Sequence, residues 1–142
     1  MSERQPGRSV TLGPNAELVR QAFERWNTED RESLLETIDP GVEIHAASAA
    51  AFGREPYRGH DGYREWLATM ADSFDHWELR PTVFHERGDT VVVLGTMHLR
   101  GRMSGVQLDQ ETGWVVQLRE EKMWRFQAFL NHKEALDAGG IS

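Results

Sequence analysis

Residues 88–105 read GDTVVVLGTMHLRGRMSG, and this stretch decides how the second half of the 142-residue chain is interpreted. Gly88-Asp89 is typical of a tight turn, and Thr90–Arg102 is rich in the β-branched and apolar residues that strands favour. Ser104-Gly105 predicts a second turn, after which residues 106–118 form another strand. The stretch therefore predicts two long antiparallel strands.

Further strands flank this pair. Residues 77–86 predict a strand before it and residues 123–130 one after it, with Glu120-Glu121 as the intervening turn. A short helix is predicted over 133–138. Nearer the N-terminus, residues 42–46 alternate like a strand, and the Ala-, Gly- and Pro-rich segment 48–59 predicts a loop.

Helical patterns dominate the first half of the chain. Asn15 is a plausible cap for a helix ending near Asn27, and a single apolar stripe runs along it: Leu18, Val19, Ala22, Phe23 and Trp26. A short helix follows Asp30 and stops at Asp39-Pro40-Gly41, and a long one runs from about residue 60 to Phe74. Helices followed by a meander of strands predict an α+β fold with an antiparallel sheet.

Composition narrows the classes of function. The formal net charge is -7 and no cluster of Lys or Arg interrupts the acidic balance, which argues against nucleic-acid binding. The chain has no cysteine, which excludes disulfides, thiolate metal sites and a cysteine nucleophile. No apolar run could span a membrane and residues 1–13 lack a hydrophobic signal region, so we expect a cytoplasmic protein. Residues 1–13 predict a flexible arm, and 14–142 a single domain.

Several motifs match a known family in order and spacing: FERWNTED at 23–30, DPGVEIH at 39–45, YRGHDGYREWL at 57–67, the stretch at 88–105, and WVVQLREEKMWRFQAFLNHKEAL at 114–136. With these motifs the chain resembles the SnoaL-like branch of the nuclear transport factor 2-like (ketosteroid isomerase-like) superfamily. The resemblance implies a cone, in which a curved antiparallel (mixed) sheet wraps around a long helix with further N-terminal helices. It also implies a pocket at the wide end of the cone.

The resemblance also implies which side chains face that pocket and bind a ligand: Ile44, Trp66, Met70, Phe74, Val92, Leu94, Thr96, Thr112, Trp114, Gln127 and Phe129. Isomerases of the superfamily use a base, an acid and a tyrosine, and the corresponding positions here carry Ile44, Trp114 and Ala22. Epoxide hydrolases of the superfamily use two carboxylates and an arginine, where this chain carries Val92, Gln127 and Thr90. Neither set of catalytic groups is present, unless a slip of one residue brings Glu43 or His45 inward.

His98 is the one titratable side chain expected to face inward from the central strands, and it is the candidate catalytic residue. A structural role at the rim of the cone is the alternative. Trp114 and Gln127 could orient a carbonyl or hydroxyl of a ligand, or Trp114 could simply fill the core. No histidine or carboxylate spacing suggests a metal site, and no cofactor is expected.

Three functions remain open. The leading one is a domain that binds a small hydrophobic ligand without an assigned reaction. A second is an isomerase, polyketide cyclase or epoxide hydrolase-type enzyme that uses His98 on a small apolar substrate. A third is a dimeric protein-interaction module. Trp77, Trp124 and Phe126 are predicted on the outer face of the sheet, which favours a homodimer through that face.

Overall fold

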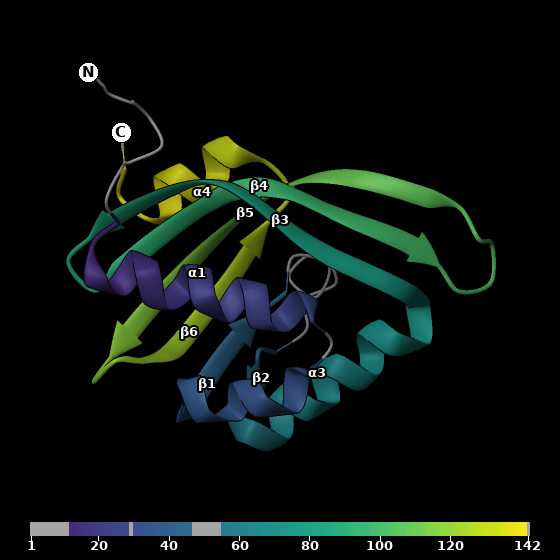
Figure 1. Cartoon of the computed structure of the whole chain (residues 1–142), viewed down its shortest axis with the longest axis horizontal. Helices are drawn as coiled ribbons and strands as arrows, with labels where there is room; N and C mark the ends of the chain where they lie inside the picture. Colours follow the sequence, from purple (N-terminus) through teal and green to yellow (C-terminus); the bar gives the residue numbers. More distant parts are fainter. Residues whose placement is uncertain (1–11, 29, 47–54, 142) are drawn as a thin grey trace.

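The computed structural model describes residues 12–28, 30–46 and 55–141 (Figure 1). Its elements, in chain order, are α1 (Pro14–Asn27), the 3₁₀ helix η2 (Arg31–Thr37), β1 (Ile38–His45), β2 (Tyr57–Arg58), α3 (Gly59–Ser73), β3 (Phe74–Arg87), β4 (Thr90–Gly101), β5 (Gln107–Arg119), β6 (Lys122–Phe129) and α4 (His132–Ala138). The predicted α+β class is confirmed. The predicted division into an arm over 1–13 and a domain over 14–142 stays a prediction, because only Leu12 and Gly13 of that arm are described.

The strands form one curved, open sheet of six strands in the order β2-β1-β6-β5-β4-β3. β1 runs parallel to β6, and every other neighbouring pair is antiparallel, as expected for a mixed sheet. β3 is an edge strand, so Pro81 removes no hydrogen bond from the sheet interior, and the register of β3 against β4 shifts between Pro81 and Val83.

The helices lie on both sides of this sheet (Figure 1). α1 crosses the concave face, and α3 closes the far end of that face beside β1 and β2. α4 lies on the opposite face, where it contacts β4, β5 and β6. Apolar side chains are consequently buried on both faces of the central strands, because each face has its own helical cover.

The start of α1 differs from the prediction. Gly13, not Asn15, is the N-cap, and Pro14 takes the first helical position, where its missing N–H is no loss. Asn15 instead donates a hydrogen bond from its side chain to the Gly88 carbonyl at 3.0 Å. The free Ala16 N–H donates to the Glu86 carboxylate at 2.8 Å, so β3 completes the cap.

Two other boundaries were also predicted wrongly. Asp39-Pro40-Gly41 lies inside β1 instead of ending a helix, because the Gly41 N–H donates to the Asp39 carboxylate and Arg119 pairs with it from β5. Phe74 begins β3 instead of ending α3. β2 falls in the predicted loop 48–59, of which residues 48–54 lie outside the described residues.

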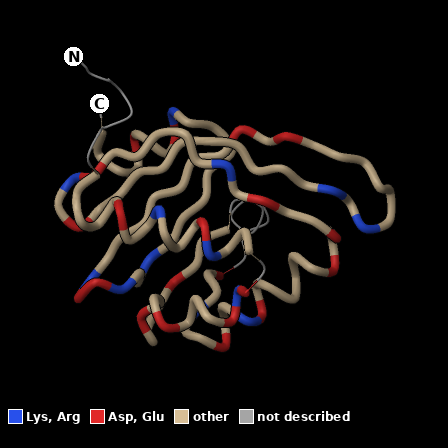
Figure 2. The backbone as a smooth tube through the Cα atoms, viewed as in Figure 1, with Lys and Arg blue, Asp and Glu red and all other residues tan. Residues whose placement is uncertain are grey.

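Acidic and basic residues are intermixed over the helices, turns and strand ends of the described chain, and neither sign gathers in one region (Figure 2). Many of them form exposed ion pairs, such as Arg64 with Glu32 and Arg100 with Asp75. No helix of the described residues is long and apolar enough to cross a membrane.

Candidate ligand cavity

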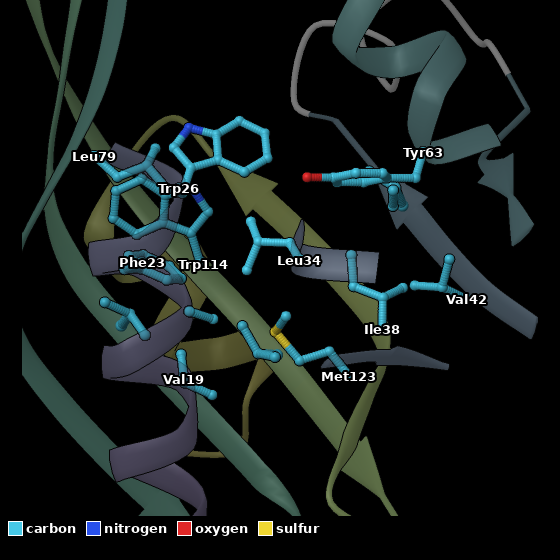
Figure 3. Close-up of a cluster of buried hydrophobic side chains, with 14 of the residues drawn as sticks. Val19, Phe23, Trp26, Leu34, Ile38, Val42, Tyr63, Leu79, Trp114 and Met123 are labelled. Carbon is cyan, nitrogen blue, oxygen red and sulfur yellow. The ribbon is translucent and has the colours of Figure 1, made fainter. Parts of the chain in front are cut away.

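A small cavity of about 40 Å³ lies on the concave side, between the helices and the sheet. Side chains from α1, η2, β1, α3, β3 and β6 line it: Ala22, Phe23, Trp26, Leu34, Ile38, Val42, Ile44, Tyr63, Trp66, Leu79, Met123 and Phe126. Leu34, Ile38 and Met123 converge on the same space from three different elements (Figure 3). Every group on this wall is apolar except the Tyr63 phenol and the Trp indoles.

Aromatic rings form most of the wall on the α1 and α3 side. Phe23 and Trp26 lie three residues apart on α1, so both face the sheet. Phe23 contacts Trp114 of β5 edge to face at 5.1 Å, while Trp26 packs against Trp66 at 5.0 Å and Tyr63 at 6.2 Å. These rigid rings hold α1, α3 and the sheet apart at fixed distances, which leaves space between them.

Tyr63 is the titratable group of this wall. Its hydroxyl donates a hydrogen bond to the Arg31 carbonyl at 2.7 Å, and burial raises the pKa of Tyr63 well above its ordinary value. The phenol therefore stays protonated at neutral pH and is already engaged with the backbone. Among the described side chains that line the cavity there is no carboxylate and no histidine, so none can remove a proton at neutral pH.

A second cavity of about 50 Å³ adjoins the first, and Ala22 and Met123 line both. Its other walls are more polar and include Gln21, Arg25 and Glu121. Met123 therefore lies between an apolar interior and a polar margin. Because a methionine side chain has three rotatable bonds, a rotation at Met123 could join the two spaces.

Some predicted ligand-binding residues lie in or against this region. Ile44 and Trp66 line the cavity, and Trp114 is fully buried behind Phe23. Met70 and Phe74 pack against the same core without lining the cavity. The one-residue slip of β1 considered above does not occur. Ile44 faces the cavity, and its neighbours Glu43 and His45 pair with each other at 3.3 Å on the other side of the strand.

For β4 and β6 the predicted inward face was wrong. Val92 and Leu94 lie under α4 on the outer face, whereas Val91 and Val93 belong to the inner core. Thr96 has the same strand parity as Val92. Thr112 is buried on β5 opposite Gly95, and its hydroxyl donates to the Gln110 carbonyl.

Gln127 and Phe129 of β6 also lie away from the cavity. They line a wider hollow of about 540 Å³ near the start of α4, together with His45, Ala128, Leu130, Glu134 and Asp137. Phe126, predicted on the outer face, lines the cavity instead, and Trp77 belongs to the inner core. In β6 both faces of the strand carry large apolar residues, Phe126 on one and Phe129 on the other, so alternation does not distinguish them.

His98 does not line the cavity and lies on the face of β4 opposite Met97 and Leu99, which pack into the inner core. Its Nδ1 lies 2.6 Å from the Asp109 carboxylate and its Nε2 lies 3.1 Å from the Gln107 side-chain oxygen. The hydrogen bond from His98 lowers the pKa of Asp109. His98 and Asp109 thus form a surface pair at the outer end of the sheet, and the expectation that His98 faces the cavity is wrong.

The described residues contain no cluster of three or more His, Asp or Glu side chains placed to hold a metal ion. The inner core contains instead buried hydrogen-bond donors without a partner among the described residues. Among the buried side-chain atoms without a hydrogen-bond partner in the described chain are the indole nitrogens of Trp26 and Trp77. The sequence places Trp26 on an apolar helical stripe and gives no sign of this feature, because no local pattern reports an unpaired N–H.

Comparison with known protein families identifies the family to which this fold belongs. The model of the SnoaL-like domain matches residues 19–126, which include every residue that lines the cavity. The chain belongs to the SnoaL-like domain family. The comparison with curated proteins gives no match.

Solved structures share the fold of this SnoaL-like domain over almost their whole length. An NTF2-like protein of unknown function from Burkholderia pseudomallei is 20% identical, with a TM-score of 0.76, and the alignment covers 90% of this chain and 98% of that one. TerC, co-crystallised with polyporic acid, is 25% identical, with a TM-score of 0.74 and coverage of 89% and 98%. A candidate SnoaL-like polyketide cyclase from Jannaschia sp. is 20% identical, with a TM-score of 0.72 and coverage of 91% and 96%.

Proposed function

We propose that this SnoaL-like domain binds a small, mainly apolar molecule in the cavity between α1, η2, α3 and the sheet. The observation that carries the proposal is an apolar space in a part of the core where side chains normally pack without voids. TerC, a structural neighbour at 25% identity, was crystallised with polyporic acid, which supports a ligand-binding role for this fold.

The size of the cavity limits how a ligand can bind. At about 40 Å³ it is far smaller than the roughly 300–1,000 Å³ of sites that hold drug-sized ligands. A ligand therefore needs some wall side chains to move. Met123 is best suited to move, because it borders the adjoining cavity of about 50 Å³ and has a flexible thioether side chain. The polar margin at Gln21, Arg25 and Glu121 would then be the mouth.

Binding is favoured over acid–base chemistry by the composition of the described wall. The positions that carry ionisable groups in ketosteroid isomerase-like enzymes hold Ile44, Trp114 and Ala22 here. The residues of β4 that face the inner core are Val91 and Val93, which are equally unreactive. An enzyme based on His98 would need a second site on the outer face. A homodimer, a protein-interaction role and a cytoplasmic location stay predictions from the sequence.

The test is direct binding of tetralin, a bicyclic hydrocarbon without polar atoms, followed by NMR titration. We expect saturable binding to the unmodified protein. Ala22→Leu, which fills the space shared by the two cavities, should weaken binding by about tenfold, equivalent to 1.4 kcal/mol. The matched control is Val115→Ala in the outer cluster, which should leave the tetralin Kd within about twofold, because Val115 is buried on the face away from the cavity.

Urea unfolding of each variant shows that it is folded at the titration temperature. The proposal is overturned if the unmodified protein shows no saturable tetralin binding. It is also overturned if Ala22→Leu and Val115→Ala change the Kd equally.

A further inference from the structure

The cavity of about 50 Å³ that adjoins the apolar one has charged groups of both signs on its wall. Arg25 comes from the last turn of α1 and Glu121 from the turn between β5 and β6, and both residues are exposed. Ala22 and Met123 line this cavity and the apolar one alike. The two charged groups therefore lie next to the apolar cavity, on its solvent side.

These two charges do not neutralise each other. Arg25 and Glu121 line the same cavity, yet the described chain contains no ion pair between them. The Arg25 guanidinium donates a hydrogen bond to the Ser33 carbonyl at 3.2 Å, and its other N–H groups are available. The Glu121 carboxylate has no hydrogen bond or ion pair among the described residues. A donor and an acceptor are thus both available at one small space.

The turn that carries Glu121 has an uncommon backbone for its residues. Glu120 and Glu121 have φ values of 53° and 67°, in the left-handed region. A two-residue hairpin turn of this kind needs positive φ at both positions and is normally made by Asn-Gly or Asp-Gly. Residues with a Cβ are strained there, and glycine is not. The chain therefore carries both carboxylates at a cost in stability, and of the two only Glu121 lines the cavity.

We propose that Arg25 and Glu121 determine the specificity of the cavity by binding a neutral hydroxyl group of an otherwise apolar ligand. The proposal rests on the proposed function, because it names the polar group of the molecule whose apolar body occupies the same site. A hydroxyl oxygen accepts a hydrogen bond from Arg25 and donates its own proton to the Glu121 carboxylate. A carboxylate is attracted by Arg25 but repelled by Glu121, and an ammonium group the reverse, so neither ion gains from both residues.

The test uses three molecules with one bicyclic frame: tetralin, 2-tetralol and 1,2,3,4-tetrahydro-2-naphthoate. Each is titrated by NMR at pH 7 and low ionic strength into the unmodified protein, Glu121→Gly, Glu120→Gly and Arg25→Met. Glu120→Gly is the matched control, because it removes the same charge and relieves the same backbone conformation at a residue that does not line the cavity. Both glycine variants should fold, because glycine adopts positive φ freely, and urea unfolding checks this.

We expect Glu121→Gly and Arg25→Met each to weaken 2-tetralol binding about three- to tenfold more than tetralin binding, which is the range of one net hydrogen bond. Glu120→Gly should change the two Kd values by the same factor. The naphthoate should respond with opposite signs: its binding should strengthen about twofold in Glu121→Gly, which removes a repulsion, and weaken by a similar factor in Arg25→Met.

The outcomes separate the proposal from the function on which it rests. If tetralin and 2-tetralol both bind and Glu121→Gly weakens them equally, the proposal is wrong and the apolar site stands. The same conclusion follows if Glu120→Gly reproduces the effects of Glu121→Gly, or if tetralin binds and 2-tetralol does not. If neither molecule binds to the unmodified protein, both the function and the proposal are overturned.

Discussion

The two faces of the central sheet are covered by helices in different ways. On the outer face α4 packs closely against β5: a Cβ added at Gly113 would lie 2.4 Å from the Cβ of Ala135, and one added at Gly139 would lie 2.2 Å from a Val92 methyl. On the concave face α1 and α3 meet the sheet through Trp, Tyr and Phe rings, and space remains between them.

The difference shows how residue size decides where a ligand can bind. Small residues let a helix backbone approach the strands until no room is left, whereas rigid aromatic rings keep elements apart and cannot always fill the gaps between them. The concave face also contains the unpaired indoles of Trp26 and Trp77. Each unpaired buried donor costs about 1–3 kcal/mol.

The largest effects should come from removing the same side chain on each face. Leu34→Ala and Leu94→Ala should each lower the free energy of unfolding by about 2–5 kcal/mol, because both leucines are buried. Only Leu34 lines the cavity, so only Leu34→Ala should strengthen tetralin binding. Urea unfolding and NMR titration measure the two quantities. Equal gains in binding for both variants would contradict the difference between the faces.

A smaller loss is expected from filling the tight contact under α4. Gly113→Ala should lower the free energy of unfolding by about 1–3 kcal/mol, because its new methyl group collides with Ala135. Adding Ala135→Gly in the same chain should recover part of that loss, although glycine in a helix itself costs about 1 kcal/mol. Tetralin binding should be unchanged. A neutral Gly113→Ala would show that α4 is loosely packed.

A weaker effect depends on pH and concerns the β1–β5 end of the sheet. The Arg119 guanidinium, followed by the Gly41 N–H, holds the pKa of Asp39 below its usual value. The ionised carboxylate therefore stabilises the fold fully above the unfolded pKa of about 3.9, and this contribution is lost as pH falls through the lower folded pKa. Asp39→Asn should lower Tm slightly at pH 7 and not at pH 2. A deficit that persists in acid would contradict this assignment.

The smallest effect is expected at the surface pair on the outer end of β4. His98→Ala removes the nearer of two partners of Asp109, Arg80 being the other, but no part of the cavity wall, so the tetralin Kd should stay within about twofold. NMR titration at pH 7 measures it. If His98→Ala weakens tetralin binding tenfold or more, His98 is part of the binding site, and the placement of that site on the concave face is contradicted.

Much of the fold followed from the sequence because its signals are local. The stretch at 88–105 has turn residues at each end and β-branched residues between them, and the stripe from Val19 to Trp26 has helical period. The arrangement of these helices and strands in space was predicted from the resemblance to the family that the motifs carry. The short helix after Asp30 was predicted, but its end at Thr37 and the early start of β1 were missed, because tertiary contacts of Asp39 override the turn signal of Pro40-Gly41.

The candidate site was harder to predict because its residues depend on which face of each strand is inward. Val91 to Leu94 is apolar at every position, since α1 covers one face and α4 the other, and alternation then carries no information. β6 has the same ambiguity at Phe126 and Phe129. By contrast, Ile44 lies between two charged or polar neighbours, and its inward position was predicted correctly.

The most direct test of the central claim is an intermolecular NOE experiment with tetralin bound to methyl-labelled protein. If the ligand occupies the concave cavity, tetralin protons should show NOEs to the methyl groups of Leu34, Ile38 and Ile44. They should show none to Leu94 under α4, to Leu136 of α4 itself, or to Leu130 beside the outer hollow. NOEs to this second set, without NOEs to the first, would contradict the account.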